Sequence, residues 1–175
     1  MSFVVSTSTV FLDGVFVWAD RTAILSGICA FFGHRDTPIT DELSEKLEQA
    51  VRNLINNGFN EFWVCYEGNF DWLSRMVMQK IKAEYGPAIY ICFISAYNPN
   101  KFSKIKLDWL KERYELDYPR EVAEGTPKFA IERRNRYIAD NADAIICYII
   151  HRQGGAYKAV HHAEKNGKMI INLAN

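Results

Sequence analysis

Four short segments hold the residues best suited to ligand chemistry, and each one follows an apolar run. They read Gly-His-Arg-Asp at 33–36, Glu-Gly-Asn-Phe-Asp at 67–71, Tyr-Asn-Pro at 97–99 and His-Arg-Gln-Gly-Gly at 151–155. Arginine offers a planar fork that matches phosphate or carboxylate, and glycine leaves backbone N–H groups open to an anion. Together the four segments predict a site for a ligand that carries phosphate or ribose.

The glycine pair Gly154-Gly155 stands at a predicted strand-to-helix junction. With no side chains in the way, a phosphate could approach the N–H groups of the helix N-terminus. Tyr157 could then stack on a base or ribose, and Lys158 could pair with the phosphate. A tight turn explains the same two glycines equally well, and the segment is neither a GxGxxG motif nor a Walker A loop.

The charged residues of the first two segments each have two interpretations. Arg35 either binds an anionic ligand or forms a structural pair with Asp36 or Glu67. His34 either contacts the ligand or hydrogen-bonds to the backbone. Asp71 begins a predicted helix, where it caps the first turn or accepts hydrogen bonds from ribose hydroxyls. The same choice applies to Glu67.

The helix predicted before the fourth strand is rich in arginine. Arg133 and Arg134 are adjacent, so at most one of them can face inward, and Arg136 is expected in solvent. His161 and His162 lie on a later helix without partners at metal-ligand spacing, which favours a plain helix surface. Arg134 is therefore the strongest basic candidate in this region.

Apolar runs alternate with segments of helical periodicity, which predicts βαβ units and a mainly parallel, three-layer α/β sheet of Rossmann-like type. Ligands bind such sheets beyond the carboxyl ends of the strands, where the strand order reverses. Predicted strands cover 27–32, 61–66, 88–94, 143–150 and 168–173, and predicted helices cover 40–57, 71–84, 127–141 and 156–166.

Two regions depart from this alternation. Asp13-Gly14 lies between apolar β-formers within 3–20, which predicts a β-hairpin and an N-terminal extension over 1–25 preceding a nucleotide-binding domain over 26–175. The hairpin serves either as a dimer arm or as a packing extension. The stretch 97–126 is too long for a plain connection, so we expect a lid-like excursion with a helix near 104–113.

Composition narrows the classes of function. The 175 residues carry 21 basic and 21 acidic side chains, so the chain lacks the net positive field that drives non-specific nucleic-acid binding. The four cysteines fall in predicted strands and form no CxxC pair, which indicates buried thiols in a reducing cytoplasm. We expect a cytoplasmic protein, because no run suits a membrane span or a secretory signal.

The loops, taken in order, resemble the SLOG superfamily, which includes the LOG phosphoribohydrolases, DNA processing protein A (DprA) and YpsA-like proteins. The match is strongest with the YpsA-like branch and covers 28–173. The residues that carry it are Gly33-His34-Arg35, Gly68-Asn69-Phe70-Asp71, Arg134-Asn135-Arg136 ahead of Ala142-Asp143, and Gly154-Gly155-Ala156.

This resemblance implies a nucleotide-derived ligand over the glycine loops. LOG enzymes cleave the N-glycosidic bond of nucleoside monophosphates with an arginine, matched here by Arg134, and a glutamate. The glutamate position holds Val160 or His161 instead. Cleavage of a glycosidic bond requires a carboxylate near the sugar, so Glu67 would have to replace the missing glutamate. Arg134 is the second catalytic candidate.

The sequence therefore favours a sensor or sequestering domain for an ADP-ribose-like or nucleoside-phosphate ligand. Phosphoribohydrolase activity is one alternative, and DprA-like binding of single-strand DNA is another. We expect a homo-oligomer, no metal and no cofactor, and we do not expect nucleic acid or a membrane as a partner. The predicted ligand-binding residues are Gly33, His34, Arg35, Gly68, Asn69, Asp71, Asn98, Arg134, Gly154, Gly155, Ala156, Tyr157 and Lys158.

Overall fold

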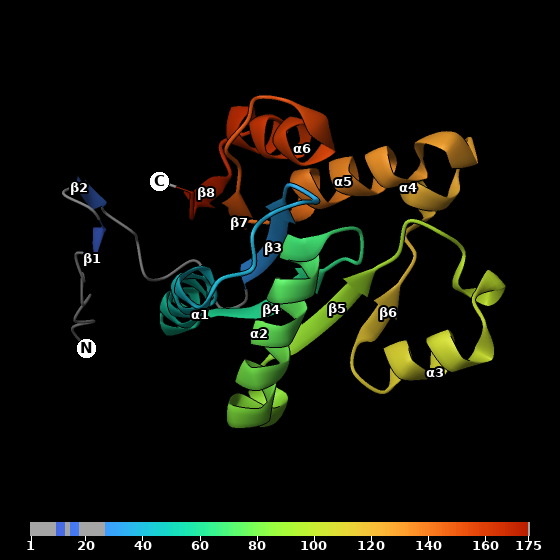
Figure 1. Cartoon of the computed structure of the whole chain (residues 1–175), viewed down its shortest axis with the longest axis horizontal. Helices are drawn as coiled ribbons and strands as arrows, with labels where there is room; N and C mark the ends of the chain where they lie inside the picture. The colour runs from blue at the N-terminus through green and yellow to red at the C-terminus, as the bar shows by residue number, and fades with distance from the viewer. Residues whose placement is uncertain (1–9, 13–14, 18–26, 175) are drawn as a thin grey trace, which may run out of the picture.

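The core of the protein is a six-stranded sheet in which every strand is parallel to its neighbours (Figure 1). The computed structural model describes residues 10–12, 15–17 and 27–174. The strand order is β6-β5-β4-β3-β7-β8, which confirms the predicted α/β class. The strands are β3 (Gly27–Gly33), β4 (Phe59–Val64), β5 (Tyr90–Ile94), β6 (Glu115–Asp117), β7 (Ala144–Tyr148) and β8 (Met169–Asn172).

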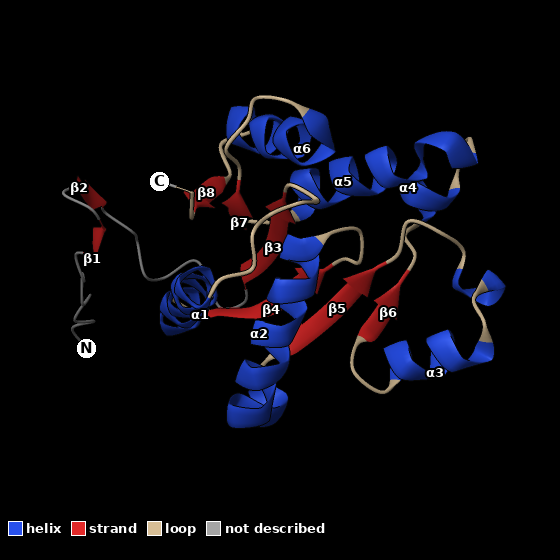
Figure 2. Ribbon diagram, in the orientation of Figure 1, coloured by secondary structure: helices blue, strands red, loops and turns tan. Residues whose placement is uncertain are grey.

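Helices cover both faces of this sheet (Figure 2). One apolar cluster joins Phe31 and Phe62 of the strands to α1, α2 and α3, and the other joins Phe32 and Trp63 to α5 and α6. Side chains of successive strand residues point to opposite faces, so adjacent phenylalanines enter different clusters. The helices are α1 (Asp41–Asn56), α2 (Asn69–Tyr85), α3 (Lys104–Lys111), α4 (Arg120–Ala123), α5 (Ala130–Asn141) and α6 (Gly154–Lys165).

Helix α1 shows why the predicted elements form. Leu43, Leu47, Val51 and Leu54 recur at helical spacing and are all buried. The Thr40 hydroxyl accepts a hydrogen bond from the N–H of Leu43 at 3.1 Å, which satisfies a free donor of the first turn. The predicted helix over 40–57 and its threonine cap are therefore confirmed.

The path of the chain fixes where a ligand can bind. From β3 the chain moves outward through β4 and β5 to β6, then returns to place β7 on the other side of β3. The strand order therefore reverses between β3 and β7, whose ladder pairs Cys29 with Ala144 and Gly33 with Tyr148. A crevice forms beyond the carboxyl ends of two such strands, because their connections leave in opposite directions.

The stretch 97–126 is more ordered than a lid-like excursion. It contains α3, α4 and the edge strand β6, whose Glu115 and Asp117 pair with Cys92 and Ile94 of β5. Three residues are too few to show a strand period, and glutamate and aspartate are poor strand formers. Strand β6 thus depends on its neighbour rather than on its own sequence.

The predicted hairpin has its two strands, β1 (Val10–Leu12) and β2 (Val15–Val17), which pair antiparallel with Leu12 opposite Val15. The remainder of the predicted 3–20 segment, including Asp13-Gly14, lies outside the described residues. The division at residue 25 and the hairpin's role stay predictions. The four cysteines are free and buried, which confirms their interpretation as core thiols.

Candidate functional site

A cavity of about 270 Å³ lies beyond the carboxyl ends of β3 and β4, where the N-termini of α2 and α6 meet the side of α5. It occupies the crevice at which the strand order reverses, the usual ligand position in such sheets. Its lining consists of Phe32, Gly33, His34, Arg35, Cys65, Glu67, Gly68, Asp71, Ile131, Arg134, Asn135, Gly154, Gly155 and Ala156. Nine of the thirteen predicted ligand-binding residues therefore meet here, and their binding role stays a prediction.

Gly33 and Gly68 let the loops after β3 and β4 pack against each other. A Cβ on Gly33 would lie 2.4 Å from the Phe70 side chain, and one on Gly68 would lie 2.8 Å from the Arg35 Cα. The N–H of Asn69 donates to the Arg35 carbonyl at 3.0 Å across the same junction. These glycines hold the rim of the cavity in place through close packing.

Gly154 and Gly155 keep the start of α6 open toward the cavity. Gly154 has φ +88°, a conformation that favours glycine, and a Cβ on Gly155 would meet only the Asn135 Nδ2 at 3.6 Å. Among the described residues, the N-cap side chain of α6, Gln153, makes no capping hydrogen bond. The first-turn N–H groups, which have no partner within the helix, are thus free to bind an anion.

Arg134 is the buried cation of the site, with 2 % of its surface exposed. Its Nη2 lies 2.7 Å from the Glu67 Oε2, and its Nε donates to the Asn135 Oδ1 at 3.0 Å. Burial lowers the pKa of Arg134, but the acidic groups around it outweigh that effect and raise it above its ordinary value, so it stays protonated. Glu67 thus pairs with Arg134 rather than with Arg35.

The neighbouring arginines, Arg133 and Arg136, point away from the cavity, as the sequence predicts. The Arg133 guanidinium donates to the Val122 carbonyl at 3.0 Å and to the Thr126 carbonyl at 2.7 Å, while Arg136 is exposed. One arginine of the adjacent pair therefore faces the cavity, and the other ties α5 to the segment before it.

Asp71 is the second carboxylate of the cavity. Its Oδ2 accepts a hydrogen bond from the Glu67 N–H at 2.7 Å. Burial raises the pKa of Asp71 from 3.8 to about 6; Arg134 and the Glu67 N–H oppose this rise, and the Glu67 charge adds to it. The cavity therefore holds the carboxyl groups of Asp71 and Glu67 beside one buried guanidinium, with Arg35 exposed at the rim.

His34 links the loops that follow β3 and β7. Its Nε2 accepts a hydrogen bond from the His151 N–H at 3.2 Å, and the two imidazole rings lie 4.5 Å apart. Burial, together with the neighbouring His151, lowers the pKa of His34, so the ring is neutral at pH 7 and can accept that bond. His34 thus bonds to the backbone, and its contact with a ligand stays a prediction.

The other four predicted ligand-binding residues lie outside the cavity lining. The Asn69 side chain donates to the Thr37 carbonyl at 3.1 Å, and the Asn98 side chain accepts from the Asn100 N–H at 3.0 Å. The Tyr157 ring stacks on His161, and Lys158 is exposed. The sequence interpretation missed four lining residues: Phe32, Cys65, Ile131 and Asn135.

Asn135 could have been found, since it directly follows Arg134 and lies one helical turn after Ile131.

Within the described ranges, no group of three or more potential ligand side chains is placed to hold a metal ion, and no helix is long and apolar enough to cross a membrane.

The sequence matches no protein-family model and no curated protein. The fold is similar to that of DprA from Streptococcus pneumoniae, with a TM-score of 0.57 and 16% identity over 82% of this chain and 49% of that one. DprA from Helicobacter pylori gives a TM-score of 0.54 and 16% identity over 82% of this chain and 63% of that one. At this identity the likeness shows a shared Rossmann-like fold, and the chain spans half to two thirds of these proteins.

One expectation about partners requires correction. The H. pylori protein is described by its mode of single-stranded DNA binding, which overturns the inference that nucleic acid is not a partner for a chain of this type. That inference rested on a net charge of zero, which averages over the whole surface. Binding depends instead on where cations and aromatic rings are placed locally.

Proposed function

We propose that this chain binds single-stranded DNA and that the cavity holds the phosphate and sugar of one nucleotide. The observation that carries the proposal is the glycine-only start of α6, which opens its N–H groups into a cavity with Arg35 exposed at the rim. A phosphate at that helix end would receive backbone hydrogen bonds and the favourable end of the helix dipole. Arg35 could contact the same phosphate or the next one.

The size of the cavity supports a polymeric ligand. Sites that enclose a complete small molecule usually have volumes of about 300–1,000 Å³. The cavity here, at about 270 Å³, is slightly smaller and suits one sugar and phosphate, with the rest of the ligand outside. A single strand can meet this requirement because its neighbouring nucleotides continue over the surface.

The likeness to DprA is consistent with binding of single-stranded DNA. It is also consistent with the proposal that this chain is a member of the SLOG superfamily. The comparisons favour the DprA side of that superfamily and give no support to the YpsA-like assignment or to ADP-ribose.

A nucleotide-derived small ligand is the second candidate, and one observation favours it. Asp71, with its pKa raised to about 6, lies in the cavity with Glu67. A carboxyl group that titrates near working pH suits proton transfer to a leaving base. In this version Arg134 positions Glu67, and the chemistry is cleavage of an N-glycosidic bond.

Fluorescence anisotropy with labelled oligothymidylate of about 16 nucleotides tests the main proposal. We expect binding that weakens with salt, competition by unlabelled single strand and weak competition by duplex. Thermal unfolding with nucleoside monophosphates, ADP-ribose and NAD tests the second candidate. A stabilising nucleotide together with no strand binding would replace the main proposal by the second.

A further inference from the structure

A group of aromatic rings and cations, which we name the stacking surface, lies beside the cavity. It consists of Tyr66, Arg75, Lys106, Trp109 and Arg113. The Arg75 guanidinium lies 4.3 Å from the Tyr66 ring centroid, and the Lys106 Nζ lies 5.2 Å from it. The Trp109 ring packs edge-on against the Tyr66 ring, with 6.5 Å between the ring centroids. The Arg113 guanidinium lies 5.0 Å from the Trp109 ring centroid.

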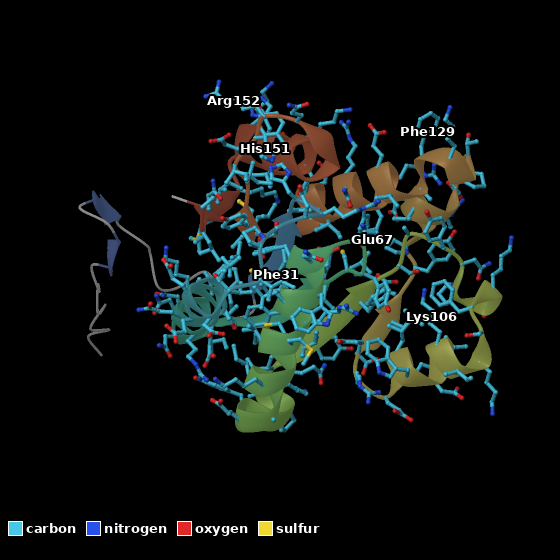
Figure 3. All side chains as sticks on the ribbon, viewed as in Figure 1. Phe31, Glu67, Lys106, Phe129, His151 and Arg152 are labelled. Atoms are coloured by element: carbon cyan, nitrogen blue, oxygen red, sulfur yellow. The ribbon has the colours of Figure 1, made fainter. Side chains whose placement is uncertain are left out.

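The stacking surface begins at the rim of the cavity. Tyr66 immediately precedes Glu67, which lines the cavity, and the Arg75 Nε donates to the carbonyl of Asp71 at 3.3 Å. From there the surface extends to α3, which carries Lys106 (Figure 3). A strand that leaves the cavity past Glu67 would therefore run toward these rings.

The rings of Tyr66 and Trp109 are exposed although each is in contact with neighbouring side chains. Tyr66 is 49% exposed and Trp109 is 36% exposed, whereas Arg75 beneath them is 7% exposed. A buried cation held against one ring fixes that ring while leaving part of it open to solvent. Arg113 also pairs with the nearby Glu112 at 3.0 Å, an exposed contact that is weak enough to be exchanged for a phosphate.

From this arrangement we infer that the stacking surface binds the bases that flank the nucleotide in the cavity. Tyr66 and Trp109 stack on bases, while Lys106 and Arg113 neutralise the phosphates between them. Aromatic platforms within a cationic groove are the usual means of binding single strands without sequence preference, since every base has a π-face. This inference rests on the proposed binding of single-stranded DNA in the cavity.

The test compares a single nucleotide, thymidine 5′-monophosphate, as the short strand with an oligothymidylate of about 16 nucleotides as the long strand, by anisotropy or by competition. Tyr66→Ala and Trp109→Ala should each weaken binding of the long strand by roughly fivefold or more and leave the short strand within about twofold. Tyr66→Phe keeps the ring and should bind like wild type. Lys106→Ala should reduce the salt dependence by about the contribution of one phosphate contact.

Tyr90→Ala is the matched control, because Tyr90 is 47% exposed at the opposite, amino end of β5. It should bind both strands like wild type. Unchanged long-strand binding in Tyr66→Ala, Trp109→Ala and Lys106→Ala would overturn the stacking surface while the cavity proposal stands. A wild-type protein that binds neither strand would overturn both. If Tyr66→Ala or Trp109→Ala unfolds, the salt dependence of Lys106→Ala still decides the matter, because a slope equal to that of wild type would overturn the stacking surface.

Discussion

The cavity and the stacking surface are adjacent, yet they are built in opposite ways. The cavity is formed by backbone approach and buried charge: Gly33 packs on Phe70, and Arg134 is paired with Glu67. The stacking surface is formed by side chains alone, and Tyr66 and Trp109 remain exposed. The cavity is therefore part of the packed interior of the fold, whereas the rings of the stacking surface lie on its outside.

This difference separates stability from binding. Changes at the buried groups of the cavity should alter the free energy of unfolding as well as binding. Changes at the exposed members of the stacking surface, Tyr66 and Arg113, should leave stability nearly unaffected, since exposed positions usually contribute little to it.

The largest effect is expected from Arg134→Ala. It leaves the Glu67 carboxylate without its partner at the cavity, so the free energy of unfolding should fall by about 4 kcal/mol. Arg113→Ala, on the stacking surface, should change it by less than about 0.5 kcal/mol. Urea unfolding of both variants gives the comparison, and equal losses would contradict it.

Asp71 should make the stability of the cavity depend on pH. Its folded pKa, about 6, lies above its ordinary value of 3.8, so the folded state holds the proton more tightly and this contribution is lost as pH rises through about 6. Asp71→Asn should match wild type near pH 4 and exceed it by up to about 3 kcal/mol near pH 8. A stability difference that does not vary with pH would contradict the assignment.

Two glycines of the cavity should respond differently to alanine. Gly33→Ala places a Cβ against Phe70 and should lower the free energy of unfolding by about 2 kcal/mol. Gly155→Ala has room for a methyl group, so its stability should be unchanged within about 0.5 kcal/mol while strand binding weakens. Calorimetry and anisotropy on the same samples separate the two effects.

The smallest effect is expected from Arg35→Ala. Arg35 is exposed at the rim, so its loss should leave the unfolding midpoint unchanged. If Arg35 contacts one phosphate, the slope of log affinity against log salt should fall by about 0.7. A slope equal to that of wild type would place the strand elsewhere on the rim.

Much of the fold could be predicted because its signals are local. The spacing of Leu43, Leu47, Val51 and Leu54 indicates α1, and alternating apolar runs and helices predict the parallel sheet. The cavity could be placed for the same reason, since parallel strands bring their carboxyl-end loops to one edge. Three of the four loop segments together hold eight of the residues that line it.

The features that escaped prediction depend on distant contacts. Strand β6 exists because β5 pairs with it, and His34 is positioned by the backbone of His151, which lies 117 residues away in sequence. The stacking surface joins Tyr66 after β4 to Trp109 on α3. The sequence contains no continuous run of basic and aromatic residues, because the fold assembles the stacking surface from separate elements.

The most direct test of the central claim is to map the amides that respond to a short oligothymidylate by NMR on isotope-labelled protein. If the strand binds in the cavity, the largest shifts should fall at 33–35, 67–69 and 154–156, around the start of α6 and the facing loops. Shifts confined to the amino ends of the strands, or none at saturating strand, would contradict binding in the cavity.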